Sequence, residues 1–257
     1  MELSFLGTGS AFTVGDGNWH SNMLVRSPNN RLLLIDCGSD ARFSMAERGL
    51  DHDDLDAVYV SHLHSDHVGG LEWLGFSRFF GSTLPRPRLF IEAGLVGPLW
   101  DQSLAGGMAR GTLATLDTYF AVEAIPADES FQWEGYRFDL TGMVHCRDGH
   151  TTLTSYGLRF AADRTRTFIT TDTRFEPDDC MRWYEWADII FHDCETRWNE
   201  TGNPQRSDIH AHYEDLKTLP ASIRRKIWLY HYHPGWLPDA VSDGFAGFAR
   251  KGQSFLL

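Results

Sequence analysis

The chain has 257 residues and a formal net charge of -12 at pH 7. This acidic balance argues against a surface that neutralises many phosphates, so a long nucleic acid is a disfavoured partner. No uninterrupted run of about 18 apolar residues is present, which excludes a helical membrane span, and the first residues lack the basic and apolar segments of a signal peptide. The four cysteines form no C-x-x-C motif, so we expect a cytoplasmic protein with reduced thiols.

The first sixty residues predict strands that are separated by turns and one helix. Strands are expected at 3–6, 22–25, 31–35 and 57–61, and a helix is expected at 40–50. The segment Gly7-Thr8-Gly9 could be mistaken for a dinucleotide-binding fingerprint. Because the third glycine and the βαβ unit are missing, a tight turn between strands is the favoured interpretation.

The expected strand at 57–61 leads directly into a segment of three histidines and one aspartate, which are His62, His64, Asp66 and His67. Imidazole nitrogens and a carboxylate oxygen together suit zinc or a similar divalent ion. Side chains at i and i+2 of a strand point the same way, so His62 and His64 can contact one ion. Asp66 and His67 lie where the chain turns and can face a second ion. A solvated polar loop is the alternative interpretation.

Residues 71–120 show a less regular pattern, in which aromatic residues are interspersed with Gly and Pro. We assign most of these aromatics to the core. The segment 75–80 follows the histidine-rich segment closely enough to form a pocket wall, and Arg78 within it could contact an anion.

The second half of the chain mixes short strands with helices. Strands are expected at 131–145, 153–160, 166–172, 187–191 and 226–231, and helices near 178–186 and 213–219. This mixture predicts an α/β fold in which two sheets are sandwiched between outer helices. Because no repeat, low-complexity tract or linker is evident, residues 1–257 are expected to form a single domain.

Four ligands near one strand end cannot complete two metal sites, so further donors must come from other strands. His145, Asp172 and His231 each end an apolar or β-branched run, where a packed sheet presents side chains to a cleft. His150 is the alternative to His145. The remaining histidines outside these candidates are interpreted mainly as surface or capping residues, namely His20, His52, His192 and His233.

The order H-x-H-x-D-H, then His, Asp and His, resembles the ligand order of the metallo-β-lactamase fold. The segments 5–9, 35–38 and 172–174 resemble its tRNase Z-like branch. The resemblance spans almost the whole chain and implies an αββα sandwich. It implies that one divalent ion is held by His62, His64 and His145, and a second by Asp66, His67 and His231, with Asp172 bridging both.

Two divalent ions at such a site can activate water and neutralise the charge of a displacement at phosphorus. Zn²⁺ is the expected metal, with Mn²⁺ as the alternative. Asp66 could in addition orient the nucleophile. Asp36 is expected behind the ligands, where it would accept an imidazole N–H, although closing a turn after a strand is an alternative role.

Two later segments, 191–195 and 209–213, resemble the motifs that supply a histidine and an acid near the leaving oxygen in tRNase Z-like enzymes. We prefer His210 as proton donor or phosphate contact, because it precedes a helix that is expected to begin near Tyr213. His212 is a close alternative.

The interval between His145 and Asp172 has no room for the arm that grips tRNA in the tRNase Z-like branch. The segments 70–77, 208–220 and 228–232 resemble instead the anti-Pycsar phosphodiesterases and their bacterial relatives. Members of that family open cyclic nucleotides and pair as homodimers. The resemblance therefore implies a homodimeric phosphodiesterase that hydrolyses 3′,5′-cyclic nucleotides to nucleoside monophosphates.

Three alternatives share parts of this pattern. A tRNase Z-like endoribonuclease would act on tRNA 3′ ends, and a β-lactamase or thioesterase would need a pocket for an acyl group. A non-enzymatic binding module would normally have lost at least one of the metal ligands, whereas every expected ligand has a candidate in this chain.

Overall fold

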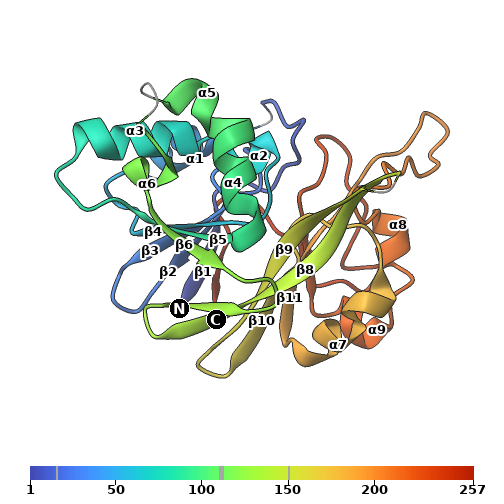
Figure 1. Cartoon of the computed structure of the whole chain (residues 1–257). Coiled ribbons are helices and arrows are strands. Elements are labelled where there is room, and N and C mark those ends of the chain that lie inside the picture. The colour runs from blue at the N-terminus through green and yellow to red at the C-terminus, as the bar shows by residue number, and fades with distance from the viewer. Residues whose placement is uncertain (16, 110–112, 150) are drawn as a thin grey trace.

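The computed structural model describes residues 1–15, 17–109, 113–149 and 151–257, and the strands of this part of the chain form two mixed sheets (Figure 1). The first sheet has the spatial order β14-β1-β2-β3-β4-β5-β6. Its strands are β1 (Glu2–Phe5), β2 (Met23–Arg26), β3 (Leu32–Ile35), β4 (Ala57–Val60), β5 (Arg88–Glu92), β6 (Ala121–Ile125) and β14 (Ser254–Leu256).

The second sheet has the spatial order β13-β12-β11-β10-β9-β8-β7. Its strands are β7 (Ser130–Trp133), β8 (Tyr136–Asp148), β9 (Thr151–Ala162), β10 (Thr165–Ile169), β11 (Ile189–Asp193), β12 (Ile227–Tyr230) and β13 (Gly247–Phe248). Chain order and sheet order agree except for β14, which returns to pair with β1 in the first sheet.

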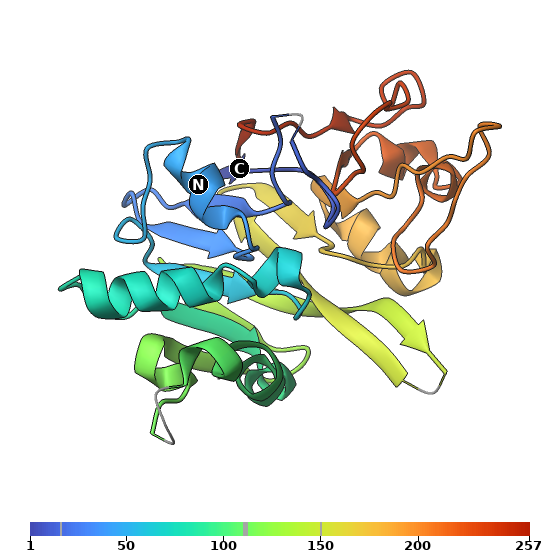
Figure 2. The ribbon, with the colours of Figure 1, turned by 90° about the horizontal axis from the view of Figure 1, so that it is seen from above.

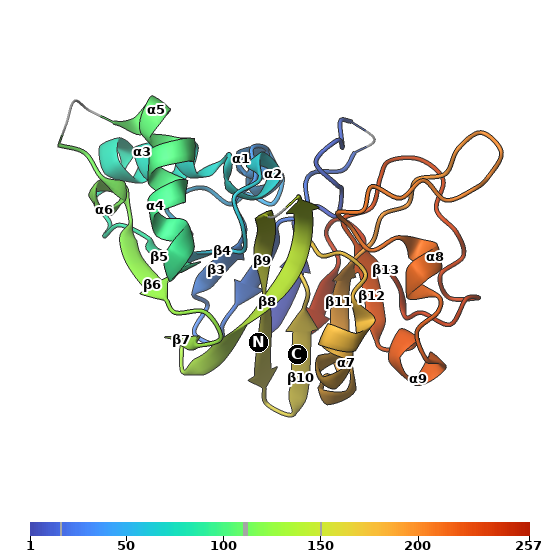
Figure 3. The same cartoon turned by 45° about the vertical axis from the view of Figure 1, so that its right-hand side comes forward.

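Helices cover the outer face of each sheet (Figure 3). The first sheet is covered by α1 (Ala41–Ala46), α2 (Ser65–Val68), α3 (Leu71–Gly81), the 3₁₀ turn Ala93–Leu95, α4 (Val96–Pro98), the π-helical turn Leu99–Leu104, α5 (Ala105–Met108) and α6 (Leu116–Tyr119). The second sheet is covered by α7 (Pro177–Trp186), α8 (Tyr213–Leu216) and α9 (Ala221–Arg224). From above, the blue and green helices lie on one side of the strands and the orange helices on the other (Figure 2).

The strand sequences explain this layering. Successive side chains of a strand point to opposite faces, and in β4 Ala57 and Tyr59 enter the core between the sheets, whereas Val58 and Val60 pack under the helices. Both faces of β4 are buried, which is why its sequence is apolar throughout. Aromatic rings from both sheets, such as Phe131, fill the space between them. The predicted αββα sandwich is therefore confirmed.

Parallel pairing brings several strand ends to one edge of each sheet. In the first sheet β3 pairs in parallel with β4, and in the second sheet β10, β11 and β12 run parallel to one another. Their carboxyl ends therefore lie at a common edge, which is the usual place for functional groups in sheets of this kind. The polar residues that follow these strands are consequently neighbours in space.

The structure differs from the expected elements in the second sheet. The strand expected at 131–145 is two strands, β7 and β8, joined by a turn in which Glu134 and Gly135 have φ angles of 50° and 81°. β8 does not end at His145 but continues to Asp148. Apolar and polar residues alternate on both sides of this turn, and only the pair Glu134-Gly135 shifts the phase, so the sequence pattern resembles one strand.

Residues 71–120, for which the sequence predicted no regular elements, contain α3, β5 and several short helices. Tyr119 and Phe120 are buried in the helix layer, and Trp73, Phe76 and Trp100 pack against it. Phe79 and Phe80 are exposed, so they do not belong to the core as the sequence suggested. The expectation that Arg78 contacts an anion is wrong, because its guanidinium is buried and donates hydrogen bonds to the carbonyl oxygens of His52 and Asp53 at 3.1 and 3.2 Å. Arg78 therefore fastens α3 to the preceding loop.

Among the helices of the described residues, none combines the length and the apolar character that a membrane-spanning segment requires.

Candidate metal centre

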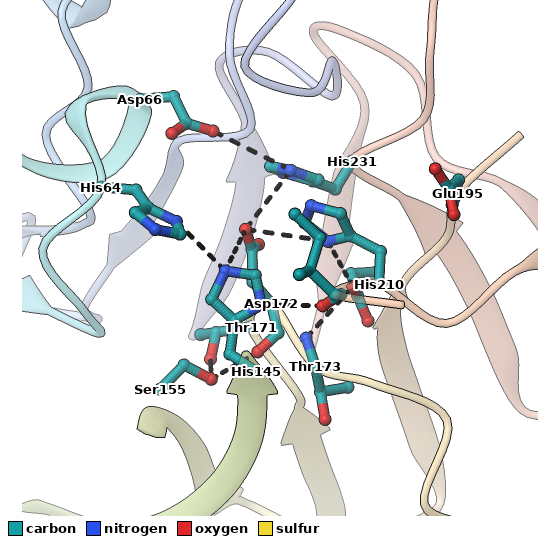
Figure 4. A network of polar contacts seen from close by, with 12 residues as sticks. His64, Asp66, His145, Ser155, Thr171, Asp172, Thr173, Glu195, His210 and His231 are labelled. Carbon is teal, nitrogen blue, oxygen red and sulfur yellow. Dashed lines mark hydrogen bonds and ion pairs between the residues drawn. The ribbon is translucent and has the colours of Figure 1, made fainter. Parts of the chain in front are cut away.

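A cluster of histidines and aspartates lies where the two sheets meet at the carboxyl ends of their parallel strands (Figure 4). From the first sheet come the residues that follow β4, and from the second sheet come Asp172 after β10, His231 after β12 and His145 near the end of β8. The seven side chains that the sequence singled out as metal ligands all lie in this cluster, and they are His62, His64, Asp66, His67, His145, Asp172 and His231.

A first group of donor atoms comprises three imidazole nitrogens and one carboxylate oxygen. Nδ1 of His64 lies 3.1 Å from Nε2 of His62 and 3.1 Å from Nε2 of His145. Oδ2 of Asp172 lies 3.8 Å from the Nε2 atoms of both His62 and His145. Four donor atoms at such short separations face one small space, which matches the ligand set of a divalent ion.

A second group of donor atoms lies beside the first. Nε2 of His67 is 3.2 Å from Oδ2 of Asp66 and 3.2 Å from Oδ2 of Asp172. Nε2 of His231 is 3.4 Å from the same oxygen of Asp172 and 3.8 Å from Oδ2 of Asp66. Asp172 thus belongs to both groups, which is the geometry expected of a carboxylate between two ions.

The buried polar atoms test whether these residues fit metal ions. Among the described residues, Oδ1 of Asp172 is buried without a hydrogen-bond partner, and Nε2 of His67 lies 3.2 Å from two carboxylate oxygens without a hydrogen bond of good geometry. A buried carboxylate oxygen or imidazole nitrogen that lacks a partner is costly unless something else satisfies it. A divalent cation would satisfy both atoms, so the residues present fit a metal centre.

At three of the candidate ligand histidines, burial favours the neutral form that metal binding requires. Burial lowers the pKa values of His62, His64 and His145, which leaves these imidazoles neutral with a lone pair to donate. At Asp172 burial acts to raise the pKa, but the charges of His231 and His67 outweigh it, and the pKa lies well below its ordinary value. The carboxylate is therefore anionic.

Most of the ligand histidines are fixed by a second contact on their other ring nitrogen. Nδ1 of His67 lies 2.8 Å from Oδ2 of Asp36, Nδ1 of His145 lies 2.8 Å from a backbone carbonyl oxygen, and Nδ1 of His231 lies 2.6 Å from Oγ of Ser21. Such partners select the tautomer and hold the ring in place. Asp36 therefore lies behind a candidate ligand.

Asp36 is positioned by the backbone as well as by its partners. It follows β3 with a φ of 61°, and its two carboxylate oxygens accept hydrogen bonds from the backbone N–H and the hydroxyl of Ser61, both at 2.8 Å. A φ in this region is uncommon outside Gly but tolerated by Asp. Asp36 thus links the end of β3 to Ser61 after β4 and supports His67. Of the two roles that the sequence left as alternatives, these contacts match the one behind a candidate ligand.

His145 reaches the cluster through an irregularity in β8. The register of β8 against β9 shifts between Val144 and Cys146, so His145 lies in a β-bulge. A bulge redirects a side chain that would otherwise follow the regular alternation of the strand. The strand continues beyond His145, but its regular pairing is interrupted at this residue. The alternative ligand, His150, lies outside the described residues.

His210 lies at the edge of the cluster and contacts a buried aspartate. Its Nδ1 is 3.1 Å from Oδ2 of Asp193, and 3.9 Å from Oδ2 of Asp172. Burial acts to lower the pKa of His210, but the hydrogen bond with Asp193 and the charge of Asp172 outweigh it and raise the pKa to about 9. These contacts favour the protonated form of His210 beside the candidate metal centre. The three side chains are also close enough to form a third donor group.

His212, the alternative to His210, is directed elsewhere. It is the N-cap of α8, where its Nδ1 accepts a hydrogen bond from the backbone N–H of Glu214, and its Nε2 lies 2.9 Å from the carbonyl oxygen of Arg197. Both nitrogens have structural partners. The structure therefore separates the two candidates and brings only His210 to the cluster.

The other histidines of the described residues have structural contacts away from the candidate ligands. His192 is buried against Tyr184, and His20 lies 3.4 Å from Asp40. The sequence indicated segment 191–195 as a source of an acid without naming Asp193, and it did not single out Ser21. Asp193 ends β11 as Asp172 follows β10, so the same strand-end pattern could have indicated it. No local signal in the sequence distinguishes Ser21.

Comparisons with known proteins agree with this description. The family model described as "Anti-Pycsar protein Apyc1" matches residues 1–255. An anti-Pycsar protein Apyc1 from Paenibacillus harenae is 34% identical over 234 residues, which cover 90% of this chain and 90% of the relative.

Two solved structures show the same fold. The metallo-β-lactamase fold protein YhfI from Bacillus subtilis superposes with a TM-score of 0.75 at 19% identity, covering 99% of this chain and 98% of that one. The short form of human tRNase Z gives a TM-score of 0.71 at 17% identity, covering 100% and 99%. The prediction of a metallo-β-lactamase fold is confirmed, and the chain belongs to the Anti-Pycsar protein Apyc1 family.

Proposed function

We propose that this protein is a metal-dependent phosphodiesterase that hydrolyses 3′,5′-cyclic nucleotides to nucleoside monophosphates. The observation that carries the proposal is a pair of donor groups that share Asp172, with His210 held at their edge by Asp193. Membership of a family whose name denotes action against a cyclic-nucleotide defence supports the same substrate class.

In this proposal His62, His64, His145 and Asp172 hold one divalent ion, expected to be Zn²⁺ or alternatively Mn²⁺. The second ion is held by a set that shares the bridging aspartate, namely Asp66, His67, Asp172 and His231. When bound, the two ions would activate water and neutralise charge at phosphorus. Asp66 also orients the attacking water, because its carboxylate lies at the edge of the second donor group.

His210 is the proposed proton donor to the leaving ribose oxygen. Asp193 accepts the hydrogen bond from Nδ1, which fixes the ring and leaves Nε2 to face the substrate. Asp193 is itself held by a hydrogen bond of 3.1 Å from the backbone N–H of Thr173, next to the bridging aspartate. The histidine and the donor groups are thus positioned by one connected set of contacts.

The connection between His145 and Asp172 favours a small substrate over tRNA. The end of β8, the whole of β9 and the whole of β10 occupy this interval. An arm that grips the elbow of tRNA would need additional chain at this position. The net charge of -12 gives the same preference, because phosphates of a long RNA would meet a largely acidic protein.

The experiment that tests the proposal is a substrate panel with purified, metal-loaded protein. Cyclic CMP, UMP, AMP and GMP are compared with a precursor tRNA, and Asp66→Ala serves as the inactive control. We expect nucleoside monophosphates to form from at least one cyclic nucleotide in the wild type, and this activity to be lost in the variant. Trimming of the tRNA with no cleavage of any cyclic nucleotide would contradict the proposal.

Assembly and location remain predictions. By resemblance we expect a homodimer, which light scattering of the metal-loaded protein would detect as twice the chain mass of 29.2 kDa. A cytoplasmic location is likewise expected, and fractionation of the source cells would test it.

A further inference from the structure

A small cavity opens beside His210, outside the two proposed metal-binding groups. Its volume is about 120 Å³. The residues that line it are Arg174, Phe175, Arg206, Asp208, His210 and Asp215. Pockets that enclose a whole drug-sized ligand are typically about 300–1,000 Å³, so this cavity can hold one group of a nucleotide and not the entire molecule.

The walls of this cavity are joined closely to the candidate metal centre. Arg174 lies two positions after the bridging residue Asp172, and its backbone N–H donates a hydrogen bond to the carbonyl oxygen of Val144, beside the bulge that presents His145. Arg206 lies on the connection between β11 and α8 that leads to His210, and this orange segment stands beside α8 in Figure 3. A substrate bound at the donor groups therefore has the cavity next to its leaving oxygen.

The charges in the cavity balance one another. Arg206 forms a two-pronged ion pair with Asp215, with Nε 2.8 Å from Oδ2 and Nη2 2.7 Å from Oδ1. Nε of Arg174 lies 3.7 Å from Oε1 of Glu176, and Asp208 adds a further carboxylate to the lining. Nδ1 of His210, the third basic side chain of the lining, lies 3.1 Å from Oδ2 of Asp193. Each basic group that lines the cavity thus has a carboxylate neighbour, which disfavours a second phosphate as the occupant.

The same lining suits a neutral, planar group with both donors and acceptors. Guanidinium groups donate hydrogen bonds in a fixed plane, and the Asp215 pair holds that of Arg206 in position. The carboxylate of Asp208 accepts hydrogen bonds, and the half-buried Phe175 provides an apolar wall. Heterocyclic bases present this combination of ring acceptors, amino or imino donors and an apolar face.

We propose that this cavity binds the nucleobase of the substrate, with Arg174 and Arg206 as specificity-determining residues. Arg174 and Arg206 donate hydrogen bonds to acceptors on the edge of the base, and Asp208 accepts one from its exocyclic amino group. The inference rests on the proposed function, because it names the part of a cyclic nucleotide that lies beyond the ribose.

The test compares Arg174→Ala and Arg206→Ala with a matched control, Arg166→Ala. Arg166, on β10, forms the same kind of exposed, two-pronged pair with Asp188, which directly precedes β11. Nε of Arg166 lies 3.0 Å from Oδ2 of Asp188, and Nη2 lies 2.8 Å from Oδ1. Each metal-loaded protein is assayed on the four cyclic nucleotides and on methyl p-nitrophenyl phosphate, a diester with no ribose and no base. Melting temperature and bound zinc are measured to confirm that each variant is folded and loaded.

For each substrate, kcat/KM on the cyclic nucleotide is divided by kcat/KM on the simple diester. We expect this ratio to fall about ten-fold in the two cavity variants, mainly through KM, and to remain unchanged in Arg166→Ala. Asp208→Asn should lower the ratio for cyclic AMP and CMP more than for cyclic UMP, since uracil has no amino group.

Two outcomes would overturn the inference, and they are distinguishable from one another. If the cavity variants lose activity equally on both kinds of substrate, or lose none, the cavity does not bind the base although the proposed function stands. If the wild-type protein cleaves the simple diester and no cyclic nucleotide, the proposed function itself fails and the cavity has no such ligand.

Discussion

The two halves of the molecule contribute to the candidate metal centre in different ways. The first sheet supplies four donors from one continuous segment, which spans the end of β4 and the start of α2 between His62 and His67. The second sheet supplies its donors singly, from a bulge in β8 and from the ends of two separate strands.

This difference shows which part of the site depends on the fold. In the first half, neighbouring positions of the chain place the donors together once β4 ends. In the second half, the parallel pairing of β10, β11 and β12 is required before Asp172, Asp193 and His231 can meet. The bridging aspartate belongs to the second half and joins the two groups. Substitutions can therefore separate the local contribution from the contribution of the sheet.

The largest effect is expected for Asp172→Ala. Because Asp172 is the donor common to both groups, its loss should reduce binding at both proposed metal sites and lower kcat/KM by on the order of 10⁴-fold. Asp66→Ala removes a donor from only one group, so it should retain more bound metal than Asp172→Ala. Elemental analysis of the purified variants measures this. Equal metal content in the two variants would show that Asp172 does not bridge.

A smaller effect is expected for His210→Ala, which removes the proposed proton donor and leaves the ligand set intact. We expect kcat to fall about 10²- to 10³-fold at unchanged zinc content, because general acid catalysis contributes gains of this size. His212→Ala is the control. It removes the cap of α8 and should lower the melting temperature with little change in kcat. A larger loss of kcat in His212→Ala than in His210→Ala would reverse the assignment.

The residues that contact the second ring nitrogen of His67 and of His231 should differ in how much they strengthen zinc binding. Asp36→Asn weakens a charged contact to His67, and we expect zinc affinity to fall by about 10- to 100-fold. Ser21→Ala removes a neutral hydroxyl from His231 and should cost less. Competition with a chromogenic chelator measures both affinities. If Ser21→Ala weakens zinc binding more than Asp36→Asn does, the charge of Asp36 is not what supports His67.

Arg78 lies in the first half of the molecule but away from the metal-donor side chains, so Arg78→Met is expected to have the smallest effect on activity. This substitution removes the buried guanidinium that fastens α3 to the loop at His52 and Asp53, so the free energy of unfolding should fall by about 2 kcal/mol. Arg88→Met, which breaks a half-exposed pair with Glu123, is the control and should cost less than about 1 kcal/mol. Urea titration measures both values. A greater loss in the Arg88 variant would contradict the role of Arg78.

The sequence indicated the fold class and the seven candidate ligands because their signals are local. Apolar runs predicted the strands, and the spacing of His62, His64, Asp66 and His67 indicated a metal-binding segment before any fold was known. His145, Asp172 and His231 could be selected because each stands at or near the end of an apolar run, where a sheet exposes side chains.

Only the tertiary structure shows which of His210 and His212 lies at the cluster. Both residues lie in the same short segment, and which ring faces Asp193 depends on the backbone path between β11 and α8. The tertiary structure likewise shows that Arg78 fastens α3 to the preceding loop and that Ser21 supports His231. It also shows that Arg174 and Arg206 line the same cavity. These residues are far apart in the chain or adopt orientations that no local pattern specifies. Their roles are fixed only when the sheets pair and the connecting segments pack against them.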